Sequence, residues 1–359
     1  MRQTLFTLFV DRFMGRGAAA VTVPPLDGAL KPNNDLEDLF NGIAAKAPDC
    51  IVDWQGVPIW SEGARLVSQS GVQTEFGSDI TAIATSDCMI AVATLNEGLL
   101  LLDDHLAQIT PNWSVPVKNV TALTFTAQNE LWYCTGSETR APDNWRRDFL
   151  EMNQLGHVGH ANLATGHVRV IKSKLGYPAG LAPMPNGSII FSEAWSSHLV
   201  EISPDGRTSR VVLDEIPGYP GRISPAQDSG YWLSIFAPRN PLIEFVLREP
   251  AYRKAMMREV APEFWVAPNY FSGRLFNEPM QGGALKQMGI LKPWAPTLSY
   301  GMVVRLDANC HPVRSFHSRA GGTRHGVTST VEADGKLWMA CRGGNEILSV
   351  DLGAEGIPA

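Results

Sequence analysis

A short sequence phrase recurs along the 359-residue chain and constrains the fold more than any other feature. In each copy a turn residue leads into a few apolar residues, then a Gly or Asn turn, then a strand-like run with an aromatic residue. The clear copies span 47–60, 119–136, 177–195, 219–236 and 325–344, and a weaker copy spans 79–98. Self-similarity in a fixed register is typical of repeated supersecondary units. The chain is therefore predicted to be built from repeats.

Strand-sized runs follow each copy of the phrase and are separated by turn residues. Examples are MIAVATL (89–95) and GLLLLDD (98–104). The 33 glycines and 25 prolines suit many strands joined by tight turns, and a hydrophobic content of 44% supports a large core. Six copies with their following strands predict an all-β fold, a six-bladed β-propeller with four strands in each blade.

The repeats also predict the domain organisation. Residues 1–45 are expected to form a leader that packs outside the blades, and 46–355 a single propeller domain. Two stretches, 137–160 and 240–299, break the period, and both contain helical patterns. Long insertions are usually functional or disordered, and the aromatic content of 240–299 argues against disorder. We expect 240–299 to form an ordered, partly helical lid over one end of the central channel.

Charge and hydropathy limit the partners of the chain. The net charge of −6 offers no basic face, which argues against nucleic-acid binding. The apolar N-terminal stretch is interrupted by Asp11 and Arg12, and no apolar run approaches the roughly 18 residues of a membrane span. We expect a cytoplasmic protein without a membrane span. The alternative for 1–17 is a short amphipathic helix on a membrane or a partner.

The five cysteines are scattered and contain no CxxC pair, so a zinc ribbon or a disulfide framework is not expected. Four of them lie in apolar strand contexts and are predicted to be buried thiols: Cys50, Cys88, Cys134 and Cys341. The chain also lacks the GxSxG, Walker A and GxGxxG phrases, which argues against a serine hydrolase or a nucleotide-binding protein.

Four segments of the chain resemble the strictosidine synthase-like family, which is related to the gluconolactonase and senescence-marker hydrolases. They are YPAGLAPMPNGSIIFSEAWSSHLVEI (177–202), LDEIPGYPGRISPAQDSGYWLSIFAPRNPLIEF (213–245), SYGMVVRLDANCHPVRSFHSRAGG (299–322) and TSTVEADGKLWMACRGGNEILSVDL (328–352). The resemblance extends over roughly 47–352 and implies a six-bladed propeller. It leaves the activity open, because one fold hosts many functions.

The resemblance implies a divalent metal, calcium or zinc, on the propeller axis. Asp49 falls at the position of the first acidic ligand of the related hydrolases. Ala179 and Gly221 stand where those hydrolases carry Asn or Asp, so two expected oxygen ligands are missing. In strictosidine synthase a Glu near the last blade acts in acid–base catalysis. The matching stretch here offers Thr328, and its nearby carboxylate, Glu332, lies close to a turn, so condensing chemistry is not supported.

Two residues are predicted to be catalytic. Asp49 and His325 precede strands whose starts should face the channel, where a carboxylate and an imidazole could activate water. Arg324 would bind an anionic group of a substrate. The structural alternatives are a turn-capping Asp, a hydrogen-bonded His and a salt-bridged Arg.

Other residues are predicted to bind substrate. Glu193 lies in an apolar run and needs a partner, which could be Arg222 or Arg239, and these two arginines are themselves predicted to bind substrate. Trp195, Tyr219, Phe236 and Trp294 could line an apolar pocket, although each is individually more often a core residue. His317, Arg319, Arg324 and His325 cluster before the last blade, which predicts a positively charged mouth and an anionic small molecule.

The sequence thus predicts a small-molecule hydrolase of lactone or ester type that acts on a polar, anionic metabolite in the axial channel. The first alternative is a non-catalytic propeller that binds a small molecule or a protein, which Ala179 and Gly221 favour. The second is a metal-free lyase or condensing enzyme.

Overall fold

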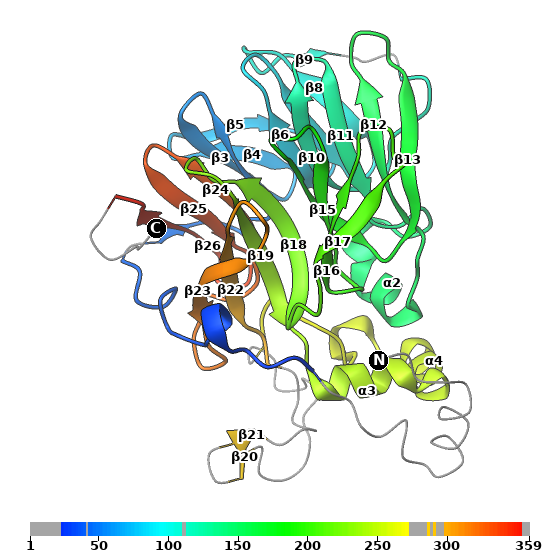
Figure 1. The fold of residues 1–359 in the computed structure, drawn as a ribbon, viewed down its shortest axis with the longest axis vertical. Coiled ribbons are helices and arrows are strands. Elements are labelled where there is room, and N and C mark those ends of the chain that lie inside the picture. The colour runs from blue at the N-terminus through cyan, green and yellow to red at the C-terminus, as the bar shows by residue number, and fades with distance from the viewer. Residues whose placement is uncertain are drawn as a thin grey trace.

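A computed structural model describes residues 23–40, 42–109, 113–272, 286–287, 290–291 and 298–353. These residues form six four-stranded antiparallel sheets, together with one small hairpin (Figure 1). Their inner strands contact one another in the cyclic order β2, β6, β10, β14, β18, β24 and back to β2. The six-bladed β-propeller predicted from the sequence is confirmed.

In each of the first three blades, the four strands are neighbours in the same order as in the sequence. Blade 1 comprises β2 (Ile51–Trp54), β3 (Val57–Glu62), β4 (Arg65–Ser68) and β5 (Gly71–Glu75). Blade 2 comprises β6 (Ile80–Thr85), β7 (Ile90–Thr94), β8 (Gly98–Leu102) and β9 (Gln108–Ile109). Blade 3 comprises β10 (Val120–Ala127), β11 (Glu130–Thr135), β12 (Gly156–Asn162) and β13 (Val168–Leu175).

The last three blades include the longer insertion and the closure of the ring. Blade 4 comprises β14 (Pro178–Pro183), β15 (Ile189–Glu193), β16 (His198–Ile202) and β17 (Ser209–Leu213). Blade 5 comprises β18 (Gly218–Pro225), β19 (Tyr231–Pro238), β22 (Gly301–Leu306) and β23 (Pro312–Ser318). Blade 6 comprises β24 (Val327–Ala333), β25 (Lys336–Cys341), β26 (Glu346–Asp351) and β1 (Ile43–Ala44).

The strand patterns explain why these segments form blades. The middle strands β7 and β8 are buried along their whole length, whereas the outer strands β5 and β9 are largely exposed. Middle strands lie between two neighbouring blades and therefore read as continuous apolar runs. The hairpin turn Asp334–Gly335 has positive φ at both residues, as a two-residue type I′ turn requires. The Gly turn within the repeated phrase is thus the tight turn of a blade hairpin.

The N-terminal segment closes the ring. Strand β1 pairs with β26, with Ile43 opposite Ile347, so the outer strand of blade 6 comes from the other end of the chain. The leader boundary expected at residue 45 therefore falls just after a blade strand. Upstream, η1 (Gly28–Leu30) and the following residues run along blades 5 and 6, where Leu36 is fully buried.

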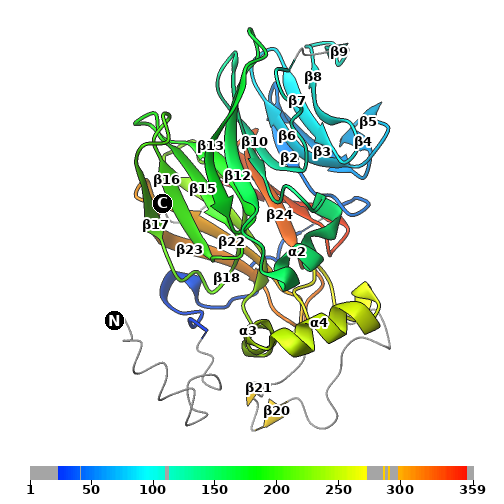
Figure 2. The same ribbon diagram turned by 90° about the vertical axis from the view of Figure 1, so that its right-hand side faces the viewer.

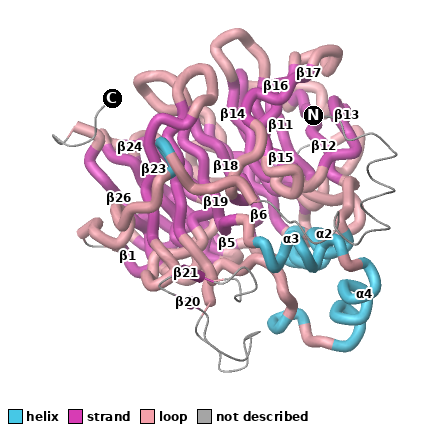
Figure 3. Tube along the Cα trace, turned by 60° about the horizontal axis from the view of Figure 1, so that its bottom comes forward, coloured by secondary structure: helices cyan, strands magenta, loops and turns pink. Residues whose placement is uncertain are grey.

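The two insertions gather at one end of the propeller (Figures 2 and 3). The first carries η2 (Pro142–Asn144) and α2 (Trp145–Glu151), and the last five residues of the expected range 137–160 belong to β12. The second carries α3 (Pro241–Arg248), α4 (Pro250–Glu259), η3 (Pro262–Phe264) and the hairpin of β20 (Lys286–Gln287) and β21 (Ile290–Leu291). The Asn240 side chain caps α3 by accepting a hydrogen bond from the Leu242 N–H at 2.8 Å.

A shared apolar core attaches the insertions to the blades. Phe149 of α2, Val246 of α3 and Trp265 pack with Tyr219 and Phe236 of blade 5. None of the described helices is long and apolar enough to cross a membrane. All five cysteines are free, and Cys88 is half-exposed rather than buried as predicted.

The closure of the ring gives a test of the fold. Leu36→Ala is expected to lower the free energy of unfolding by about 2–4 kcal/mol, because it leaves a cavity among side chains of blades 5 and 6. Urea unfolding measures the change. Val57→Ala, at a side chain that is 48% exposed, is the control and should change stability much less. Equal effects of the two substitutions would contradict the packing described for Leu36.

Candidate functional site

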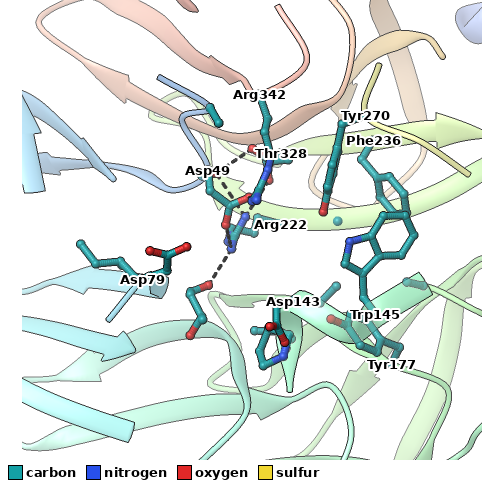
Figure 4. Close-up of a pocket in the computed structure, with 18 of the residues that line it drawn as sticks. Asp49, Asp79, Asp143, Trp145, Tyr177, Arg222, Phe236, Tyr270, Thr328 and Arg342 are labelled. Atoms are coloured by element: carbon teal, nitrogen blue, oxygen red, sulfur yellow. Dashed lines mark hydrogen bonds and ion pairs between the residues drawn. The ribbon is translucent and has the colours of Figure 1, made fainter. Parts of the chain in front are cut away.

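A cavity of about 210 Å³ lies at the end of the axis where the inner strands begin (Figure 4). Asp49, Thr81, Thr121, Ala179, Arg222 and Thr328 line it, and each comes from a different blade. Trp145 and Tyr270 line it from the two insertions. The cavity is thus formed by all six blades together with the helical end of the molecule.

Bulges at the start of the inner strands direct these side chains into the cavity. The strand pairing shifts register around Thr81, Thr121, Ala179 and Thr328, each the second residue of its inner strand. In β18 the shift extends over Gly221 and Arg222. A bulge leaves one residue outside the regular pairing and re-aims its side chain. The repeated phrase therefore directs one side chain of each of these blades into the same cavity.

Asp49 is held between two arginines. Its Oδ2 accepts a hydrogen bond from Arg222 Nη2 at 2.7 Å, and its Oδ1 accepts one from Arg342 Nη1 at 2.7 Å. Burial by itself raises the pKa of Asp49, but the two guanidinium groups outweigh burial and lower the pKa to about 2. Asp49 is therefore a carboxylate at neutral pH, with both oxygens engaged by cations.

Arg222 connects four blades. It starts on blade 5 and bonds Asp49 of blade 1, and its Nη2 also donates to the Thr81 carbonyl of blade 2 at 2.8 Å. Its Nη1 donates to the carbonyl oxygens of Asp49 at 3.2 Å and of Thr328, on blade 6, at 3.3 Å. Burial acts to lower its pKa, but Asp49 raises it above the usual value, so Arg222 stays charged.

Arg342 lies nearer to the opening of the cavity. Its side chain is 37% exposed, and its guanidinium lies 4.8 Å from the centre of the Tyr270 ring. Among the described residues it hydrogen-bonds through Nη1 alone, to Asp49. The remaining guanidinium donors can therefore bind a ligand in the cavity.

Aromatic side chains lie together on one side of the cavity, as Figure 4 shows. Trp145 lies edge-on to Phe236 and to Tyr270, with ring centres 5.3 Å apart in both pairs. Tyr177 stacks on Trp195 at 4.5 Å. At the rim, Asp79 and Asp143 are exposed carboxylates. The cavity therefore combines a cationic region, an apolar wall and an acidic rim.

The structure places Asp49, Arg222 and Trp195 in the cavity, together with Phe236. It does not place His325 there. The His325 ring is 2% exposed, and its Nε2 donates to the Arg319 carbonyl at 2.9 Å, so Nδ1 accepts from the Ser299 hydroxyl at 2.7 Å. Both nitrogens are used in structural hydrogen bonds, so the expected general base has no access to a substrate in this cavity.

Arg324 anchors the N-terminal segment and does not line the cavity. It donates to the carbonyl oxygens of Leu36 and Leu39 and pairs with Glu346 at 3.2 Å. His317 is fully buried and bonded to the Tyr300 hydroxyl, so it adds no charge to the mouth. His317, Arg324 and His325 thus make structural contacts, and none of the four residues of the expected cluster, the exposed Arg319 included, lines the cavity.

Three further candidates lie behind the wall of the cavity. Glu193 does not pair with Arg222 or Arg239; it accepts hydrogen bonds from the Gly176 N–H at 2.8 Å and from His198 at 3.2 Å. Arg239 pairs with Glu244 at 3.1 Å, and Tyr219 donates to the same carboxylate at 3.4 Å. The fourth, Trp294, lies outside the described residues.

Arg342, Tyr270, Trp145 and Tyr177 line the cavity but were missed by sequence reasoning. A signal for Arg342 exists in the repeats. Gly63, Leu95, Ala194 and Arg342 each directly follow the second strand of a blade, and all four line the cavity. Arg342 is the charged member of that set. The insertion residues carry no comparable signal, because they lie outside the period.

With Arg222 and Arg342 bonded to Asp49, the described residues do not fit a divalent metal on the axis. Ala179 and Gly221 line the cavity at positions where oxygen ligands were expected, and neither has a ligating side chain. Both carboxylate oxygens of Asp49 are bonded to guanidinium groups. Within the described ranges, no three His, Cys, Asp or Glu residues are grouped closely enough to hold a metal ion. Glu332 bonds Trp232 and the Gln227 N–H, so it is not an acid–base group in the cavity.

Comparisons with known proteins agree with the resemblance inferred from the sequence. The chain is 24% identical over 246 residues to the adipocyte plasma membrane-associated proteins of Salmo salar and of Danio rerio, which covers 65% of this chain. It spans about half the length of these curated relatives, 51% and 52%. No family model matches the chain.

The structure is similar to that of a calcium-binding protein, regucalcin, from Agrobacterium tumefaciens. The TM-score is 0.52 at 12% identity, and the match covers 87% of this chain and 93% of the other. Together these similarities confirm the expected resemblance to strictosidine synthase-like proteins and to the regucalcin type of propeller. The structural likeness shows the fold alone, since the identity is low.

The Asp49 ion pairs predict a pH dependence of stability. Because its pKa is lower in the folded state than its usual value of 3.8, Asp49 stabilises the fold above that pH, and this stabilisation is lost as the pH falls towards about 2. Asp49→Asn should remove about 2 kcal/mol of pH-dependent stability from this window. Urea unfolding at both ends of the window measures it.

The control for this prediction is Asp104→Asn, an exposed carboxylate in blade 2. Its unfolding curves should follow those of the unchanged protein at both pH values. The same pH dependence in Asp49→Asn as in the unchanged protein would contradict the ion pairs described for Asp49.

Proposed function

We propose that the protein binds a small organic anion with an apolar body in its axial cavity. The observation that carries this proposal is the charge of the group formed by Asp49 and the two arginines, apart from the exposed carboxylates at the rim. Asp49 contributes one negative charge, and Arg222 and Arg342 contribute two positive charges, so the group carries a net charge of +1. An anionic group of the ligand would neutralise this excess positive charge.

Arg342 is the residue proposed to bind the anionic group. Its guanidinium is partly exposed to the cavity and keeps donors beyond the one that bonds Asp49. A guanidinium suits a carboxylate or a phosphate because it presents paired N–H donors in one plane. Arg222, at the cavity floor, adds a second positive charge that would also attract the anionic group.

The aromatic wall supports an apolar ligand body. Trp145, Tyr177 and Phe236 line the cavity together with Tyr270, whose ring lies against the Arg342 guanidinium. Pockets for drug-sized ligands commonly measure about 300–1,000 Å³, so a cavity of about 210 Å³ favours a smaller molecule. An aryl or short alkyl carboxylate has the size and the polarity that this arrangement would accept.

A lactone or ester hydrolase is the second candidate function. The arginine donors beside the cavity favour it, because they could stabilise charge that develops on a carbonyl oxygen. Asp49 is poorly suited to act as the general base that such a hydrolase needs. Such a base works best with a pKa near the operating pH, and the pKa of Asp49 is about 2. Binding without turnover is therefore the better supported function.

Calorimetry with phenylpropanoate, hexanoate and their uncharged amides tests the binding proposal. The acids should bind and the amides should bind more weakly, because a charge-assisted hydrogen bond contributes about 1.5–3 kcal/mol. Arg342→Gln should weaken binding of the acids by roughly 10–100-fold. The matched control is Arg239→Gln, at an arginine that pairs with Glu244 outside the cavity.

Other outcomes separate the candidates. Equal binding of acids and amides, or no binding at millimolar concentration, would contradict the proposed anion site. Incubation with phenyl acetate and with butyrolactone tests turnover. Hydrolysis that is lost in Arg342→Gln and kept in Arg239→Gln would favour the hydrolase over a binding protein.

A further inference from the structure

Four oxygens from three blades surround the end of the Arg222 side chain. They are Oδ2 and the carbonyl oxygen of Asp49 and the carbonyl oxygens of Thr81 and Thr328, at 2.7, 3.2, 2.8 and 3.3 Å from the Nη atoms. Figure 4 shows Arg222 reaching Asp49 across the cavity floor. Carboxylate and backbone carbonyl oxygens are also the ligands that calcium prefers.

The oxygens have the chemistry of a cation site, and they do not satisfy all donors of the guanidinium. A guanidinium presents five N–H donors in one plane, and here the two Nη groups take all four oxygens. The fifth donor, Arg222 Nε, is buried and has no hydrogen-bond partner in the described part of the chain. The two bonds from Nη1 are also long, at 3.2 and 3.3 Å.

We infer that the Arg222 guanidinium occupies a cation site built for a hard divalent ion and makes the protein independent of such an ion. Asp49 and the three carbonyl oxygens form the site, and the guanidinium supplies the positive charge that holds blades 1, 2 and 6 against blade 5. Removal of this side chain exposes an oxygen-lined site of the calcium type. This inference concerns the contacts of Arg222 at the cavity floor and does not depend on the ligand proposed above.

The donor set of the site favours calcium over zinc. It consists of one carboxylate oxygen and three backbone carbonyl oxygens, which are hard ligands of the kind that calcium prefers. Cys50 Sγ lies 3.6 Å from Asp49 Oδ2 and 3.6 Å from the Thr81 carbonyl oxygen, and it donates to these oxygens.

Thermal unfolding of chelator-treated full-length protein, with and without calcium chloride, tests the inference. The unchanged protein should show the same midpoint in calcium and in chelator. Arg222→Ala should have a lower midpoint without calcium and regain several degrees at millimolar calcium, because an ion that binds only the folded state stabilises it. Calorimetry should show one calcium per chain in Arg222→Ala.

Three controls define the site. Arg342→Ala removes the other arginine on Asp49 but leaves Arg222 in place, so it should gain no calcium response. Arg222→Lys keeps a cation and should also show none. The double variant Arg222→Ala with Asp49→Asn should lose the response, because the carboxylate oxygen is removed from the site.

Several results would overturn the inference. These are calcium binding by the unchanged protein, an equal response in Arg342→Ala, or a response in Arg222→Ala to zinc but not to calcium. Arg222→Ala that stays insoluble in calcium as well as in chelator also counts against it, because the site has then failed to accept the ion. None of these results depends on whether phenylpropanoate binds.

Discussion

The ion pair between Asp49 and Arg222 is the interaction on which the site depends. These residues are 173 positions apart in the sequence, and their contact joins blade 1 to blade 5 across the axis. The same guanidinium bonds carbonyl oxygens of blades 1, 2 and 6, so it fixes the starts of several inner strands at once. A single buried cation thus sets the geometry of the cavity floor and its charge.

The shape and polarity of the cavity depend on the parts of the chain that depart from the repeat. The blades contribute small or hydroxyl side chains, such as Thr81, Thr121 and Ala179, which leave space open. Trp145 and Tyr270 come from the insertions, and they provide much of the aromatic wall. The blades form the axial opening. The insertions and the two arginines give the cavity its aromatic and cationic surfaces.

The repeated phrase was sufficient to predict the blades and to place Asp49 near the axis, because the period assigns equivalent positions in every blade. It was not sufficient to orient side chains at the strand starts. His325 and Arg324 precede Gly326, which adopts a positive φ, and their side chains bond the Ser299 hydroxyl, Arg319 and the N-terminal segment instead. These contacts follow from tertiary packing, as does the pairing of Asp49 with Arg342, which lies 293 positions away.

The replacement of an axial ion by Arg222 that we infer would change what a propeller can do with its axial site. A divalent ion with an open coordination position can polarise a carbonyl group and lower the pKa of bound water. A guanidinium supplies positive charge and hydrogen bonds, but it has no coordination position to offer. Arg222 therefore retains the structural role of a central cation, since it neutralises Asp49 and links the blades. Lewis-acid activation of water is absent from its chemistry, and the nearby Arg342 is then suited to hold an anion in place.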